Sequence, residues 1–241
     1  MTRSDNRSPD HLRAVTMQPD FVMHPEGSVL IKMGNTHVLC NATLENKVPY
    51  WMKAQRKSGG WVTAEYALLP RSTSTRVSRE TRGPRGRTQE IQRLIGRSLR
   101  AAINLDLLDG YTCTIDCDVI QADGGTRTAA ITGGYVALVL ALRTLIDDEK
   151  IPAEVLTSPV AAISVGMVGG EPMLDLCYEE DFSADVDFNV VMTAEGEFIE
   201  VQGTAEGVAF SRAQLDQLLD LAEKGIQELL VIQQEILKAE A

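Results

Sequence analysis

Residues 123–128 read Asp123-Gly124-Gly125-Thr126-Arg127-Thr128 and join an alternating segment to an apolar one. The glycines free the backbone, the threonines offer hydroxyl groups and the arginine offers a planar guanidinium. At the start of a helix this combination is suited to binding an oxyanion such as phosphate, because the first amide groups of a helix have no partner within it. The alternative is a tight strand-to-helix connection with an incidental arginine. The stretch matches neither GxxxxGK[ST] nor GxGxxG, so it indicates no familiar nucleotide-binding loop.

Periodicity on both sides of this stretch predicts a strand before it and a helix after it. From Tyr111 to Gln121 apolar residues alternate with threonine and aspartate, which is typical of a half-buried strand. The following helix is expected from about Thr128 to Asp147. An earlier helix is expected to start near Thr88, with an apolar face and three arginines on the other face. Those three are Arg93, Arg97 and Arg100, for which a solvated helix face is the alternative to binding a polyanion.

The rest of the chain predicts hairpins and one long terminal helix. Gly34-Asn35, Gly169-Gly170 and Glu195-Gly196 are turn signals between strand-like runs. The expected strands lie within 28–40, 61–66, 160–168, 173–178, 186–193 and 198–202. Ser211 with Gln214 forms a capping box for a final helix to about Lys238. This order predicts a single domain over residues 1–241, a mixed α/β (α+β) sandwich with helices packed on largely antiparallel sheets.

The charge of the chain is unevenly distributed. The net charge of −11 argues against a nucleic-acid-binding protein, yet residues 53–100 hold twelve Lys/Arg and only three acidic residues. A basic tract in an acidic protein indicates a polyanion-binding face, and a solvated loop or a subunit interface are the alternatives. Within it, residues 70–86 lack apolar periodicity and place Arg71, Arg76 and Arg79 among hydroxyl side chains suited to phosphodiester contacts. Residues 70–87 lack interleaved aromatics, which favours contact with the backbone of a polyanion over base stacking.

Several function classes have little support. The N-terminus is polar, unlike a secretory signal, and the longest apolar run, Tyr135–Leu142, is too short to span a bilayer. We therefore expect a cytoplasmic protein without membrane contact. Four cysteines without a CxxC pair, all in strand-like segments, are expected to be buried reduced thiols. Three dispersed histidines show no zinc spacing, and no GxSxG elbow is present.

A cluster of carboxylates at residues 179–187 contains the candidate metal ligands Asp181 and Asp187. Mg²⁺ prefers hard oxygen ligands and takes one or two carboxylates together with phosphate oxygens and water. Six residues of straight strand would separate the two aspartates by roughly 20 Å, so the chain must turn between them, with Ser183-Ala184 as the expected corner. An acidic surface loop is the alternative.

Several separate blocks of the sequence resemble the ribonuclease PH family of phosphate-dependent 3′→5′ exoribonucleases, in the family's order and over almost the full length. The blocks are 3–7, 34–40, 60–66, 69–76 with 79–80, 86–97, 123–128, and Asp181, Ala184, Asp187 with 189–192. The resemblance implies a βαβ-containing sandwich similar to a ribosomal-protein domain, assembled as a hexamer of three dimers. It further implies a tRNA nucleotidyltransferase that trims the 3′ end of precursor tRNA and releases nucleoside diphosphates.

The resemblance also implies roles for individual residues. Gly125, Thr126 and Arg127 would bind the attacking phosphate together with Arg87, which we place just before the helix cap. Asp181 and Asp187 would hold Mg²⁺ and assist proton transfer, and Arg127 would act with them in catalysis. Arg71, Arg76 and Arg79 would line the RNA path. A catalytically silent RNA-binding ring subunit and a small-molecule phosphotransferase are the competing hypotheses.

Overall fold

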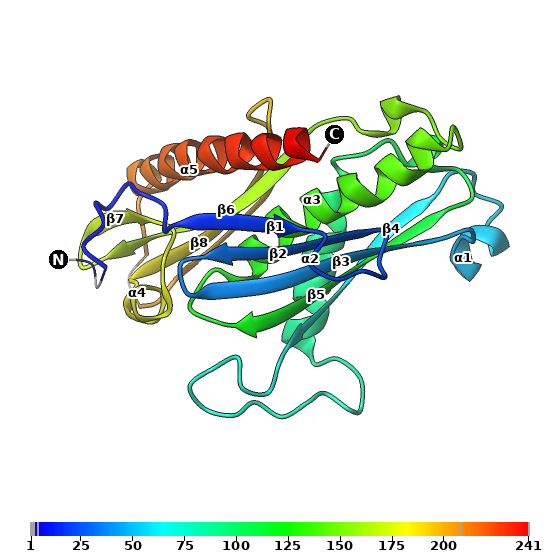
Figure 1. Ribbon diagram of the computed structural model, residues 1–241. Coiled ribbons are helices and arrows are strands. Elements are labelled where there is room, and N and C mark those ends of the chain that lie inside the picture. The colour runs from blue at the N-terminus through cyan, green and yellow to red at the C-terminus, as the bar shows by residue number, and fades with distance from the viewer. Residues whose placement is uncertain (1–2, 4, 208, 241) are drawn as a thin grey trace.

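The computed structural model describes residues 3, 5–207 and 209–240, and two β-sheets dominate it (Figure 1). The first sheet has the spatial order β1-β2-β3-β5-β4. Its strands are β1 (Val15–Pro19), β2 (Gly27–Met33), β3 (Thr36–Glu45), β5 (Thr112–Gln121) and β4 (Trp61–Leu68). Only the β4–β5 pair is parallel, and α2 (Gly86–Arg100) makes the crossover between them. This β4-α2-β5 unit is a βαβ element of the kind that the resemblance implied.

The second sheet has the order β7-β6-β8-β9 and is antiparallel throughout. Its strands are β7 (Glu171–Leu174), β6 (Val160–Val168), β8 (Val186–Thr193) and β9 (Phe198–Ala205). The expected mixed sandwich of largely antiparallel sheets is therefore confirmed.

Helix α3 (Thr126–Asp147) joins the two sheets, because it packs on β2 and β3 of the first sheet and on β6 of the second. Gly27 allows β2 to approach α3 closely, because a Cβ at that position would lie only 2.0 Å from the carbonyl oxygen of Ala137. α3 is long and apolar enough to cross a membrane by composition, but most of its residues are buried in the core. The long helix α5 (Arg212–Ala239) packs against the second sheet, beginning at the Ser211–Gln214 capping box as expected.

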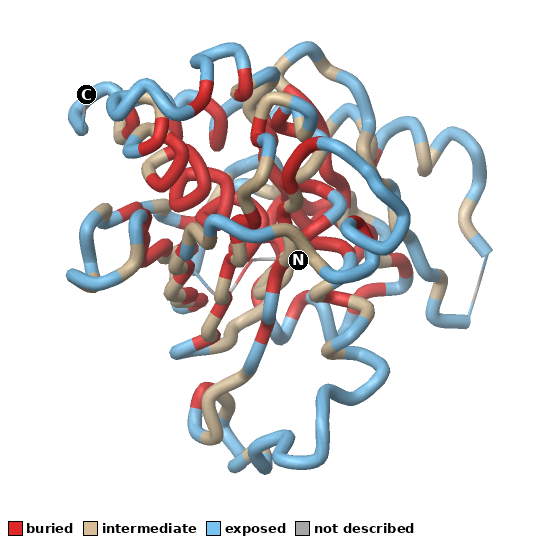
Figure 2. Tube along the Cα trace, turned by 90° about the vertical axis from the view of Figure 1, so that its right-hand side faces the viewer, coloured by how far each residue is buried: buried red, intermediate tan, exposed pale blue. Residues whose placement is uncertain are grey.

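The predicted hairpins at Gly34-Asn35, Gly169-Gly170 and Glu195-Gly196 are all confirmed. The alternating residues of β5 bury one face, and the four cysteines are buried and free. Residues 70–85 form a long loop without helix or strand, at the bottom of Figure 1, and Figure 2 shows it to be mostly exposed.

Some boundaries predicted from the sequence are wrong. The strand expected over 173–178 ends at Leu174, because Asp175 takes a left-handed backbone (φ +56°) and Cys177 caps a short helix, α4 (Tyr178–Ser183). Helix α1 (Tyr50–Ala54) was not expected. Two 3₁₀ turns, Leu105–Leu108 and Ala153–Val155, complete the described elements. Helices α2 and α3 each begin two residues earlier than their periodicity suggested.

Candidate active site

The glycine-rich stretch lies between the end of β5 and the start of α3. Gly124 (φ +72°) and Gly125 (φ +64°) both take the left-handed backbone that the sequence anticipated from two glycines. Gly125 is the N-cap of α3 and has no side chain to satisfy the first amides of that helix. The first-turn N–H groups of Thr126, Arg127 and Thr128 therefore form a surface on which an anion can bind.

Two residues that the sequence did not single out hold this loop in place. The Thr36 hydroxyl donates to the carbonyl oxygen of Gly124 (2.6 Å) and accepts from the amide of Asp123 (3.0 Å). Arg13 is buried, donates to the carbonyl oxygen of Asp123 (2.5 Å) and forms an ion pair with buried Asp175 (2.6 Å). A buried guanidinium must be paired and hydrogen-bonded to offset its lost hydration. Arg13 therefore serves to hold the loop in position and is not available to a ligand from solvent.

The side chains of Thr126 and Arg127 are oriented by neighbouring strands and helices. The hydroxyl groups of Thr126 and Tyr66 lie 2.7 Å apart. Arg127 Nη1 donates to Gln202 of β9 (2.6 Å) and to Glu90 of α2 (3.2 Å). Both bonds come from Nη1, and Nε and Nη2 of the guanidinium make no hydrogen bond to the part of the chain that the structure describes.

Arg87 adds a second positive charge to the site, and Tyr66 lies within range of both arginines. Arg87 lies in the first turn of α2, whereas the sequence placed it just before the helix cap; Gly86 already has helical conformation. Burial raises the pKa of Tyr66, and the positive charges of Arg87 and Arg127 partly offset that rise. Tyr66 therefore stays protonated at neutral pH and lies within electrostatic range of both arginines.

The two aspartates come from different elements, as the predicted turn required. Asp181 lies on α4, the chain turns at Ala184, and Asp187 lies near the start of β8. Asp181 is accessible to solvent, but the protein atoms around its carboxyl group raise its pKa, against the lowering effect of Arg87, Arg127 and Arg13. The site thus sets two carboxylates beside two or three guanidinium groups.

The charge of Asp187 is less well compensated. Burial raises its pKa most, the negative charges of Asp181 and Glu206 add to the rise, and Arg127 opposes it. The two aspartates are therefore close enough to repel each other. Glu206 is a third acidic group at this edge that the sequence did not single out, because it follows β9 rather than the acidic cluster. A divalent cation bound between Asp181 and Asp187 would relieve this repulsion.

Comparison with known proteins identifies the family. The 3′ exoribonuclease family model matches the chain in two parts, domain 1 over residues 11–143 and domain 2 over residues 158–225. A protein named ribonuclease PH from Syntrophomonas wolfei is 56% identical over 98% of this chain and 99% of its own length. Another ribonuclease PH, from Solibacter usitatus, has the same identity and coverage. The chain belongs to the ribonuclease PH family of 3′ exoribonucleases. The resemblance drawn from the sequence is confirmed.

Two solved structures share the fold of this ribonuclease PH family member. Rice (Oryza sativa) Rrp46 superposes with a TM-score of 0.75 at 18% identity, covering 95% of this chain and 97% of its own. The Archaeoglobus fulgidus exosome with RNA bound to the active site gives a TM-score of 0.75 at 21% identity, covering 94% and 91%. At such identities the likeness shows the shared fold.

In this ribonuclease PH family chain the three loop arginines lie apart from the glycine loop in sequence but border the same sheet. Arg71, Arg76 and Arg79 are all exposed, and none forms an ion pair with the described residues. Burial raises the pKa of Asp118, and the positive charge of Arg79 partly offsets that rise. Arg79 also lines a cavity of about 440 Å³ together with Tyr66 and Thr88. The cavity therefore connects the loop to the wall of the candidate site.

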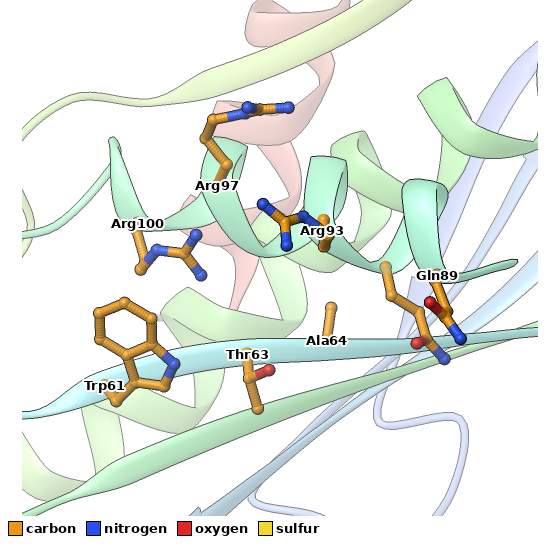
Figure 3. A pocket seen from close by; sticks show the side chains of 8 residues that line it. Trp61, Thr63, Ala64, Gln89, Arg93, Arg97 and Arg100 are labelled. Atoms are coloured by element: carbon orange, nitrogen blue, oxygen red, sulfur yellow. The ribbon is translucent and has the colours of Figure 1, made fainter. Parts of the chain in front are cut away.

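A second basic concavity lies along the exposed side of α2, with a volume of about 490 Å³ (Figure 3). Arg93, Arg97 and Arg100 line it from the helix, and Trp61 lines it from β4. The guanidinium of Arg100 stacks on the Trp61 ring at 4.5 Å and donates to the carbonyl oxygen of Val62 (2.9 Å). The alternative of a simple solvated face therefore does not describe Arg100, because an indole from the neighbouring strand covers it.

Proposed function

We propose that this site carries out phosphorolysis of RNA from the 3′ end. The observation that carries the proposal is the pairing of an uncapped helix start with the oriented guanidinium of Arg127, opposite two carboxylates that repel each other. A reaction between two phosphate groups requires a binding site for an anion next to a binding site for a cation.

In this reaction an oxygen of inorganic phosphate attacks the phosphorus of the last phosphodiester. The bond between that phosphorus and the 3′ oxygen of the penultimate nucleotide breaks, and this oxygen takes up a proton. The products are a nucleoside diphosphate and an RNA shortened by one nucleotide. Since a diphosphate bond of similar energy replaces the phosphodiester, the enzyme also runs in reverse as a nucleotidyltransferase.

Roles for the residues follow from their positions. The amides of Gly125 and Thr126, with the free edges of Arg127 and Arg87, bind the attacking phosphate. We assign to Asp181 and Asp187 the proton transfer to the leaving 3′ oxygen and the neutralisation of charge there, because the two carboxylates lie within electrostatic range of Arg127 and of each other. The raised pKa of both carboxyl groups supports a part in proton transfer, because a group that binds a proton more tightly donates and accepts it nearer neutral pH.

The same two aspartates fit a magnesium ion. They provide two hard oxygen ligands, and their mutual repulsion supports a cation between them. When bound, the ion would supply charge neutralisation at the phosphate oxygens. The described residues hold no group of three His, Cys, Asp or Glu side chains arranged around a metal. Two carboxylates with phosphate and water suit Mg²⁺, which rarely uses a full protein cage.

We propose precursor tRNA as the substrate, in the cytoplasm, with the chain acting as a tRNA nucleotidyltransferase. Support comes from the relatives named ribonuclease PH and from a fold neighbour described as an exosome with RNA bound to the active site. A ring of three dimers is supported by neighbours described as exosome cores. We propose that the chain is one domain over residues 1–241, and one hydrophobic cluster of the described residues, which includes both sheets, α3 and α5, supports this.

The test of this function is the product. Short single-stranded RNA incubated with the protein, Mg²⁺ and inorganic phosphate is expected to yield nucleoside diphosphates, and to stay intact without phosphate. Release of nucleoside monophosphates regardless of phosphate would indicate hydrolysis and contradict the proposal. A silent ring subunit would bind the RNA without any product, and a small-molecule phosphotransferase would ignore it.

Replacing Arg71, Arg76 and Arg79 together with glutamine is expected to weaken RNA binding and to flatten its salt dependence. Three lost phosphate contacts reduce the slope of log K against log[salt] by about 2 for a single strand. The measurement is RNA affinity over a salt series. Neutralising three exposed cations elsewhere, Lys150, Arg212 and Lys238, is the matched control. An unchanged slope in the loop variant would assign those arginines to a subunit interface.

A further inference from the structure

Two large aromatic side chains on α4, Tyr178 and Phe182, are exposed to solvent instead of packing in the core. Tyr178 is 58% exposed and Phe182 is 81% exposed, and their rings stack with centroids 6.1 Å apart and planes at 29°. Two adjacent apolar rings at such exposure form a patch suited to binding another molecule.

The helix presents this pair on the face that carries a site residue. Tyr178, Asp181 and Phe182 stand at positions i, i+3 and i+4, which share one side of a helix. Glu180 points to the opposite side, where it forms a buried ion pair with Arg3 at 2.7 Å. This anchor fixes the rotation of α4, so the rings and the Asp181 carboxylate face outward together.

The aromatic pair also adjoins the phosphate loop. The amide of Tyr178 donates to the Asp123 carboxylate at 3.1 Å. Gly124 lies so close to this backbone that a Cβ would meet the Leu176 carbonyl oxygen at 2.5 Å and the Tyr178 nitrogen at 2.9 Å. The backbone of Tyr178, at the start of α4, therefore lies against the glycine-rich loop proposed to bind the phosphate.

We propose that Tyr178 and Phe182 form a stacking platform for the bases at the 3′ end of the RNA, beside the phosphate and aspartate groups of the site. The inference rests on the proposed function. The arginine loop, residues 70–86, has no aromatic residues, so a surface that stacks on bases has to come from elsewhere. The positive charges of Arg87, Arg127 and Arg13 act on Asp181, which shares this side of α4 with the rings, and they favour an anionic strand there over an acidic protein partner.

Stacking on a ring accepts any base, because every base has a π face. The platform thus holds the RNA end while the chemistry proceeds, binding ground state and transition state alike. Its loss is expected to raise KM with little change in kcat.

The experiment compares Phe182→Ala and Tyr178→Ala with the wild type on two RNAs, one unmodified and one whose last two riboses carry no base. Wild-type KM is expected to rise about fivefold to tenfold when the bases are removed. Each alanine variant is expected to show that same rise on unmodified RNA and little further rise on abasic RNA. Phe182→Trp is expected to restore the wild-type difference. Tyr50→Ala, which removes an equally exposed ring from α1, is the control and keeps wild-type behaviour.

The outcomes separate the two proposals. Shortening of RNA that needs phosphate but is equally sensitive to base removal in wild type and variants would overturn the platform alone. A wild type that shortens no RNA would overturn the proposed function itself. A change in oligomeric state on Phe182→Ala, seen by light scattering with unaltered base dependence, would assign the rings to contact between copies of the chain and also overturn the platform.

Discussion

Replacing Arg127 with alanine is expected to lower phosphate-dependent release of nucleoside diphosphates by about 10³-fold or more. Arg127 donates from Nη1 to Gln202 and Glu90, and its Nε and Nη2, which bond to none of the described residues, remain for a phosphate at the start of α3. Alanine removes both the fork that grips the phosphate and a charge that stabilises the transferring group. Rates measured over a phosphate series should show the loss as failure to saturate.

RNA binding should survive this change, because the arginine loop is untouched. Arg127→Lys keeps the charge without the fork and is expected to recover only part of the rate. Arg212→Ala, which removes an exposed arginine paired with Asp216 on α5, is the control and should act as the wild type. If Arg127→Ala trimmed RNA at the normal rate with phosphate present, the phosphate site would have to lie elsewhere.

Changing Asp187 to asparagine is expected to reduce turnover by about 10²- to 10⁴-fold and to remove the Mg²⁺ dependence of the residual rate. The substitution keeps the shape of the side chain and removes one of two carboxylates that repel each other, so a cation loses its seat and the leaving oxygen loses a proton partner. The measurement is the rate of diphosphate release over a magnesium series.

Asp185→Asn is the matched control, since this exposed carboxylate precedes the same strand by one residue. It should leave both the rate and the magnesium dependence unchanged. The pH profile adds a second readout: Asp187 loses its charge as the pH falls through its raised pKa, so an acid limb above the range of an ordinary carboxyl group should disappear in Asp187→Asn. A fully active, magnesium-dependent Asp187→Asn enzyme would contradict the assignment.

Much of the site was predictable because its chemistry is local. Gly124-Gly125 in a left-handed turn, a helix starting beside Thr126 and a chain reversal between Asp181 and Asp187 all depend on neighbours in sequence. The roles of these residues remain predictions for the experiments above. The helix α4 escaped notice because a strand-like pattern continued past Asp175, whose left-handed backbone ends the strand.

The supporting residues were not predictable from local pattern. Arg13 and Asp175 are 162 positions apart, and Gln202 meets Arg127 across 75 positions. Nothing in the periodicity around Arg13 or Gln202 distinguishes them from ordinary polar residues. A solvated face was one of the alternatives for Arg100, and only the fold brings Trp61 against its guanidinium and leaves it half-buried.

The order of residues along the chain was enough to set strands, helices, turns and the chemical groups available, because propensity, capping and alternation act over a few residues. Only folding decided which distant groups share one site, which arginine is paired and which is left with free edges, and how strongly two carboxylates repel. Those properties arise from burial and from Coulomb interactions through space, and separation along the sequence does not determine either.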